Sequence, residues 1–115
     1  MTTNNHSPII YIAGPMTGLP EYNYPAFHRA AETLTALGYE VLSPATHTAD
    51  VDTDEIKPWD FYMRHALGLL IRADAVALLP GWENSTGARI EKQLALDLGM
   101  RIAPVDGWVA VARLS

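Results

Sequence analysis

Short apolar runs alternate with longer amphipathic segments along the chain. The run at residues 8–13 is uninterrupted, β-branched and aromatic, which is typical of a strand buried on both faces of a parallel sheet. Three further runs predict strands at residues 39–42, 75–79 and 101–105. Apolar residues at spacings of three and four predict helices over residues 24–37, 59–72 and 85–98. The pattern is therefore one of alternating strands and helices.

This alternation predicts an α/β fold with a mainly parallel sheet of four to five strands and helices on both faces. We expect one Rossmann-like or flavodoxin-like three-layer domain over residues 8–115, after a flexible polar tail at residues 1–7. The acidic segment at residues 45–58 has no periodicity and is either a mobile lid or padding. The last ten residues carry Trp108, Val109 and Val111, and fit either an edge strand or a segment docked on a partner subunit.

Two loops rich in glycine and proline follow predicted strands. The first strand is followed by Gly14, Pro15, Met16, Thr17 and Gly18, and the third by residues 80–85. In doubly wound sheets, ligands bind beyond the carboxyl ends of the strands, where the winding direction switches. We expect the two loops to face each other at this point.

The second loop leads into a helix whose start suits an anionic ligand. Gly81 and Gly87 allow close approach to the backbone, and Asn84 or Ser85 is expected as the N-cap. The free amides and the helix dipole attract a phosphate or a carboxylate. Glu91 follows Gly87 by one turn, so its carboxylate leans toward the same mouth. The pattern indicates chemistry, and the alternative is a solvated helix with a favourable N-terminal glutamate.

Composition narrows the choice of ligands. The hydrophobic share of 49% and the charged share of 18% indicate a globular chain, and the net charge of -5 argues against a nucleic-acid polymer or an anionic membrane. The lack of cysteine excludes disulfides, thiolate zinc sites and a cysteine nucleophile. No membrane span or signal peptide is visible, so we expect a cytoplasmic protein. His28, His47 and His65 lack metal-ligand spacing, and we expect neither a metal nor a cofactor.

Three motifs carry a family resemblance. They are Ile-Tyr-Ile-Ala-Gly-Pro-Met-Thr-Gly at residues 10–18, Tyr-Met-Arg at residues 62–64, and Leu-Leu-Pro-Gly-Trp-Glu-Asn-Ser at residues 78–85, which continues to Gly87, Ala88, Arg89 and Glu91. In these residues the chain resembles the nucleoside 2-deoxyribosyltransferase superfamily, especially a small branch common in phages. The resemblance covers almost the whole chain apart from its ends.

The resemblance implies a nucleoside or nucleotide ligand and N-glycosidic chemistry. Relatives exchange or remove the base, and a glutamate on the helix after the third strand attacks the anomeric carbon. That glutamate corresponds to Glu91, with Ser85 and Gly87 in the places that help to hold the nucleotide. Tyr11 either orients Glu91 by a hydrogen bond or is a core aromatic with its hydroxyl at the edge. Relatives form dimers or larger oligomers, so a homodimer or higher homo-oligomer is expected.

The chain departs from the hydrolases of this superfamily at two positions. Ala66 stands where they carry a catalytic aspartate, and Thr17 where the phosphate-binding loop carries an arginine. Candidate substitutes are Glu83 and Asp60 for the carboxylate and Arg64 or Arg89 for the cation; the alternative for each is a surface or interface ion pair. Trp59 and Trp82 are candidates to stack on a base; Trp82 in the motif loop is favoured, with packing as its alternative.

Three hypotheses follow. The first is an enzyme that releases or exchanges the base of a nucleoside or its 5′-monophosphate, with Glu91 as nucleophile. The second is a non-catalytic protein of phage type that binds or sequesters a nucleotide. The third is an assembly module whose motif loop lies at a subunit interface.

Overall fold

A computed structural model describes residues 8–46 and 58–114. The predictions about the polar tail, His47 and most of the acidic segment lie outside these residues. The outlines of the remaining predicted elements agree with the structure to within about two residues at each end, the usual uncertainty of helix and strand boundaries.

Four parallel strands form the sheet, in the order β2-β1-β3-β4. They are β1 (Ile9–Ala13), β2 (Glu40–Leu42), β3 (Ala75–Leu78) and β4 (Arg101–Pro104). The two central strands pair in parallel register from Ile10 opposite Ala75 to Ala13 opposite Leu78. The winding direction switches between these strands, since β2 lies on one side of β1 and the later strands on the other.

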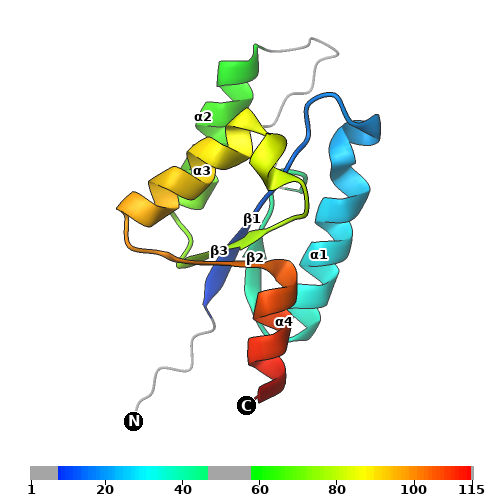
Figure 1. Cartoon of the computed structure of the whole chain (residues 1–115), viewed down its shortest axis with the longest axis vertical. Coiled ribbons are helices and arrows are strands. Elements are labelled where there is room, and N and C mark those ends of the chain that lie inside the picture. The colour runs from blue at the N-terminus through cyan, green and yellow to red at the C-terminus, as the bar shows by residue number, and fades with distance from the viewer. Residues whose placement is uncertain (1–7, 47–57, 115) are drawn as a thin grey trace.

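Helices cover both faces of the sheet (Figure 1). They are α1 (Tyr24–Ala36), α2 (Trp59–Leu70), α3 (Thr86–Asp97) and α4 (Val105–Leu114), with short 3-10 turns η1 (Pro20–Asn23) and η2 (Trp82–Asn84). Figure 1 shows α1 and α4 on one side and α2 and α3 on the other. The predicted three-layer α/β architecture with a parallel sheet is confirmed.

Alternation along β1 divides the core into two clusters. Ile10 and Ile12 pack with Phe27 and Leu34 of α1, while Tyr11 and its neighbours on the other face pack under α2 and α3. Because side chains of a strand point alternately to opposite faces, this register decides that Tyr11 faces α3. It also places Tyr11 on the same side of the sheet as Glu91.

The segment after β4 is a helix, so the edge strand, one of the two predicted alternatives, was wrong, while docking on a partner subunit stays a prediction. Trp108 of α4 is 7% exposed, and its Nε1–H donates to the Val76 carbonyl oxygen at 2.9 Å. The Trp108 ring also meets Tyr39 edge-on, with 5.8 Å between the ring centroids. Valine and tryptophan favour strands by propensity. In α4, however, the less exposed residues recur with the period of a helix, so one face of α4 packs against α1 and β3. This tail therefore packs on its own domain.

Candidate functional site

The two glycine-rich loops meet at the carboxyl edge of the sheet. They follow β1 and β3, whose last paired residues are Ala13 and Leu78. A Cβ atom built on Gly81 would lie 3.4 Å from Cγ of Pro15, so the loops touch. The prediction that these loops face each other is confirmed.

The shape of the first loop has local causes. The Leu19 amide donates to the Met16 carbonyl at 3.1 Å, and Gly18 takes φ +84°, as a turn with a left-handed third residue requires. Thr17 is exposed at this turn. A Cβ on Gly14 would come within 2.7 Å of Cβ of Leu79, so close packing against the segment after β3 already requires glycine there.

The second loop ends at a capped helix. Ser85 has extended backbone, and its Oγ accepts a hydrogen bond from the Ala88 amide at 3.1 Å. Ser85 is therefore the N-cap, and the alternative Asn84 lies exposed in η2. Because this bond uses the Ser85 oxygen, other amides of the first turn are left to attract an anion.

Glu91 lies inside the domain on α3. Its side chain is 5% exposed, and Oε2 accepts a hydrogen bond of 2.6 Å from the Tyr11 hydroxyl, whose residue is 0% exposed. Ala88, Glu91 and Ala95 form the buried stripe of the helix, at spacings of three and four. The alternative of a solvated N-terminal glutamate is therefore wrong, and the hydrogen bond considered for Tyr11 is present.

Burial changes the protonation of this pair. Removal from water raises the pKa of Glu91 from 4.5 to about 7, and the hydrogen bond from Tyr11 opposes this rise by favouring the carboxylate. The pKa of Tyr11 is raised well above 10, first by burial and then by the charge and hydrogen bond of Glu91. Tyr11 thus keeps its proton and donates, while Glu91 exists in both forms near neutral pH. A group poised in this way is suited to acid, base or nucleophilic chemistry.

The two positions that depart from the hydrolases differ in burial. Ala66 of α2 is 7% exposed and packs in the same apolar cluster as Tyr11, so a side chain at this position faces the interior near the pair. Thr17 lies at the surface of the first loop.

The candidate substitutes are surface residues. Arg64 Nε lies 3.6 Å from Asp60 Oδ2, with the two side chains 84% and 65% exposed. Glu83 and Arg89 are also exposed. The predicted alternative of a surface ion pair therefore holds for Asp60 and Arg64.

The two candidate tryptophans differ in their surroundings. Trp82 packs partly buried against the cluster under α2 and α3, and Lys92 Nζ lies 5.0 Å from the centre of its ring. Trp59 is 48% exposed. A Cβ atom built on Gly87 would lie 3.9 Å from Cζ2 of Trp59 and 3.1 Å from Sδ of Met63. Trp59 is thus the more accessible ring at the N-terminus of α3. The sequence favoured Trp82 and gave Met63 only as part of the Tyr-Met-Arg motif, not as a site residue. The spacing of four between Trp59 and Met63, which puts both on one helix face, is the signal that could have placed Met63 beside Trp59.

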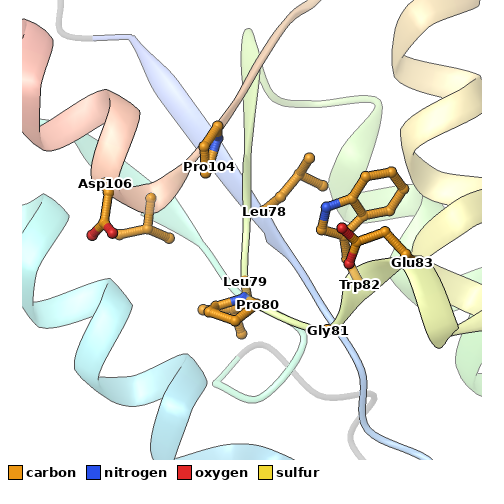
Figure 2. A pocket seen from close by; sticks show the side chains of 9 residues that line it. Leu78, Leu79, Pro80, Gly81, Trp82, Glu83, Pro104 and Asp106 are labelled. Carbon is orange, nitrogen blue, oxygen red and sulfur yellow. The ribbon is translucent and has the colours of Figure 1, made fainter.

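Two pockets of about 430 and 480 Å³ lie beside the second loop, toward α4 and α1. Figure 2 shows Asp106 on one side of the first pocket and Trp82 and Glu83 on the other. Neither pocket is lined by Glu91 or Tyr11. The buried pair of Tyr11 and Glu91 is therefore the candidate site, because a carboxyl bonded to a tyrosine hydroxyl is chemically specific.

The described residues offer no sign of a bound metal or a membrane span. No three histidine, aspartate or glutamate side chains among residues 8–46 and 58–114 gather closely enough to hold a metal ion. Within the same ranges, each helix is too short or too polar to cross a bilayer.

Comparisons with known proteins agree with this fold. The family model "Domain of unknown function (DUF4406)" matches residues 8–104, and a search of curated proteins finds no match. A solved 2-deoxyribosyltransferase from the psychrotolerant bacterium Bacillus psychrosaccharolyticus has a TM-score of 0.62 and 23% identity, covering 82% of this chain and 69% of that one. A conserved protein from Enterococcus faecalis V583 has a TM-score of 0.66 and 20% identity, covering 85% of this chain and 63% of that one. At these identities the likeness shows a shared fold.

Proposed function

We propose that this chain, which belongs to the DUF4406 family of domains of unknown function, breaks the N-glycosidic bond of a nucleoside or its 5′-monophosphate with Glu91 as nucleophile. The observation that carries the proposal is the buried Glu91 carboxyl, held by Tyr11 beside the carboxyl edge of the sheet. Burial of a carboxyl without a cationic partner is costly, and among the described residues neither an ion pair nor a metal site offsets this cost for Glu91. The fold shared with a 2-deoxyribosyltransferase supports the same class of substrate.

The reaction divides into two displacements at the sugar. Glu91 attacks C1′ as the C1′–N bond breaks, so the electron pair of that bond leaves with the base and the base takes up a proton. The product is a glycosyl ester on Glu91. Water, or a second base, then attacks C1′ and restores the carboxylate, with the proton of the attacking group passing to solvent. Water makes the protein a hydrolase, and a second base makes it a transferase.

Tyr11 supports both the position and the charge of the nucleophile. Within the described residues, Glu91 accepts one hydrogen bond, at Oε2, so Oε1 is the oxygen free to attack. A donor at Oε2 stabilises the carboxylate form that the attack requires. The oxocarbenium-like sugar in the transition state carries positive charge, and a carboxylate in a site of low dielectric stabilises it strongly.

The loops around the pair suit the rest of a nucleotide. We place the sugar and any phosphate against Gly14, Pro15, Met16, Thr17 and Gly18 and the first turn of α3. The amides of the first turn of α3 that the Ser85 cap leaves free favour an anion there. Trp59 offers an exposed ring for the base beside Gly87, whereas one side of Trp82 is occupied by Lys92.

A second candidate function is binding or sequestration of a nucleotide without chemistry, as in a protein of phage type. Ala66 favours it, because an apolar methyl group occupies the position where the hydrolases carry an aspartate. With no carboxyl group there, the leaving base depends on solvent or on the substrate for its proton. Under this reading a nucleotide raises the melting temperature of the protein although free base never forms.

Chromatographic detection of free base separates these candidates. Wild type and Glu91→Gln are incubated with a panel of nucleosides and 5′-monophosphates, with and without an acceptor base. Glu32→Gln, which changes an exposed carboxylate of α1 with no proposed role, is the matched control. Base release by wild type and Glu32→Gln, but not by Glu91→Gln, supports the enzyme, whereas equal release by all three contradicts Glu91 as nucleophile. If no compound of the panel yields free base but a nucleotide raises the melting temperature, the binding function is supported.

Assembly is part of the same proposal. We expect a homodimer or higher homo-oligomer, in line with the superfamily that the sequence resembles. Light scattering on the purified protein measures the molar mass directly, and a monomer at micromolar concentration contradicts this expectation.

A further inference from the structure

Three consecutive residues before α1 adopt a backbone conformation that side chains disfavour. Glu21, Tyr22 and Asn23 have φ values of +53°, +52° and +61°. L-residues with a Cβ atom enter this left-handed region singly and rarely, because the Cβ approaches the following carbonyl oxygen. A run of three persists only where surrounding contacts stabilise it, and such runs concentrate at functional sites.

The side chain of Asn23 makes the contact that stands out in this segment. Asn23 occupies the N-cap position of α1, yet its side chain caps no amide of that helix. Its Nδ2–H donates instead to the Pro15 carbonyl oxygen at 3.0 Å, eight residues earlier, in a partly buried position. Tolerance of left-handed backbone would explain an asparagine at this position, but it does not explain the hydrogen bond from the Asn23 side chain to Pro15.

The bond reaches both loops of the site. Pro15 belongs to the first loop, and its ring lies 3.4 Å from a Cβ built on Gly81 in the second. The second loop continues through η2 to the Ser85 cap of α3, the helix that carries Glu91. Asn23 thus fixes one end of a short series of contacts, from Pro15 to Gly81 and on to the start of α3.

We infer that Asn23 is a positioning residue, which holds the first loop against the second in the geometry that binds the ligand. Its role in ligand binding rests on the proposed function, whereas its hold on the loop does not. The left-handed backbone brings the side-chain amide of Asn23 within hydrogen-bonding distance of the Pro15 carbonyl oxygen. This hydrogen bond fixes the backbone position of the first loop.

Variants at two neighbouring positions separate the hydrogen bond from the backbone strain. Asn23→Asp keeps the size and the left-handed tolerance of asparagine but replaces the donor by an acceptor. Asn23→Gly relieves the backbone and removes the amide. Glu21→Gly relieves the same kind of backbone at an exposed residue and leaves the Asn23 bond intact, so it is the matched control.

Hydrogen exchange tests the hold on the loop without any need for activity. The reporter is the Leu19 amide, which bonds Met16 in the first loop. We expect exchange at Leu19 to be at least tenfold faster in Asn23→Asp and Asn23→Gly than in wild type, and unchanged in Glu21→Gly. Unchanged exchange in both Asn23 variants overturns the inference.

Kinetics test the link to the ligand. On the substrate found in the base-release panel, both Asn23 variants should raise KM at least fivefold with kcat within about twofold of wild type, while Glu21→Gly keeps both constants. A change confined to the melting temperature makes Asn23 merely structural and overturns the positioning role. If wild type releases no base, the proposed catalytic function fails. The nucleotide-dependent rise in melting temperature then replaces KM as the measure of ligand binding. In that case Asn23→Asp should at least halve this rise, and an unchanged rise overturns the positioning role.

Discussion

The Tyr11 hydroxyl donates to Glu91 Oε2 over 2.6 Å, although 80 positions separate the two residues in the sequence. This bond joins β1 to α3 beneath the two loops. It is also the interaction that favours the carboxylate form of Glu91 against the effect of burial.

Removal of the Tyr11 hydroxyl should slow the reaction and shift its pH dependence. Attack requires ionised Glu91, so kcat/KM should rise with pH through an apparent pKa near 7. Tyr11→Phe removes the bond that lowers this pKa, so the rising limb moves to higher pH. A hydrogen bond to a charged group contributes about 1.5–3 kcal/mol, or roughly 10-fold to 100-fold in rate. Tyr39→Phe, on the other face of the sheet, is the control and should keep the wild-type dependence of kcat/KM on pH. If the rising limb of this dependence does not shift in Tyr11→Phe, the proposed role of the Tyr11–Glu91 hydrogen bond is contradicted.

Ionisation of Glu91 should also destabilise the fold as the pH rises. The pKa in the folded state, about 7, lies above the ordinary value of 4.5, so the folded protein binds more protons than the unfolded chain between these values. This contribution to stability is complete below about pH 4.5 and is lost as pH rises through 7. The shift is equivalent to about 3 kcal/mol.

Glu91→Gln removes the titration while keeping an oxygen that can accept from Tyr11. The free energy of unfolding of this variant, relative to wild type, should therefore increase between pH 5 and pH 8, as measured by denaturant unfolding at each pH. A difference that stays constant with pH would show that Glu91 does not titrate in this range.

The two tryptophans near the site should respond differently to substitution. Trp59→Ala removes an exposed ring beside Gly87, so we expect KM to rise about tenfold with a small change in melting temperature. Trp82→Ala removes a ring packed on the core and beneath Lys92, so we expect a loss of about 2–4 kcal/mol in stability. Steady-state kinetics and thermal melting of both variants measure these effects. If Trp82→Ala raises KM and Trp59→Ala lowers stability instead, Trp82 is the residue that stacks on the base.

Two glycines allow a test of the packing at the carboxyl edge. Gly14→Ala places a methyl group 2.7 Å from Cβ of Leu79, an atom that cannot swing away, so it should cost about 1–3 kcal/mol. Gly68→Ala on the exposed side of α2 meets no atom within 4 Å and should stabilise the protein by about 0.5–1 kcal/mol. Thermal melting of the two variants measures both effects, and a neutral Gly14→Ala would show that the loop can move away from Leu79.

Introduction of a carboxylate at Ala66 tests the departure from the hydrolases. Ala66→Asp buries an acid beside the apolar cluster that contains Tyr11, so it should lower the melting temperature. If the site binds a nucleoside as proposed, the same acid should protonate the leaving base and raise base release at least tenfold. Ala66→Asn has nearly the same size without an acid group, and should show the loss of stability alone. Equal rates for the two variants would place Ala66 away from the leaving base.

Much of the fold follows from local pattern. Apolar runs of four to six residues, helical stripes and dense breakers are each encoded within a few positions. They indicated the two loops and, in the part of the chain that the structure describes, the four strands and three of the four helices. The spacing from Gly87 to Glu91 indicated a carboxylate near the carboxyl edge. The fourth helix was missed because valine and tryptophan also suit a strand, and its helical period becomes decisive only when Trp108 finds β3 and α1 beside it.

The chemistry of the site was decided by contacts between distant segments. The sequence by itself determined that a parallel sheet would carry two glycine-rich loops at one edge, because the alternation of strands and helices and the positions of the breakers are local signals. Only the tertiary structure decided that Glu91 is buried, that Tyr11 holds it, that Ser85 is the cap and that Trp59 is more open than Trp82. These outcomes depend on the register of β1 against β3 and on where α2 and α3 pack upon them. A pKa near 7 arises from that packing, since no neighbour in the sequence removes water from a carboxyl group in the way that the folded sheet and helices do.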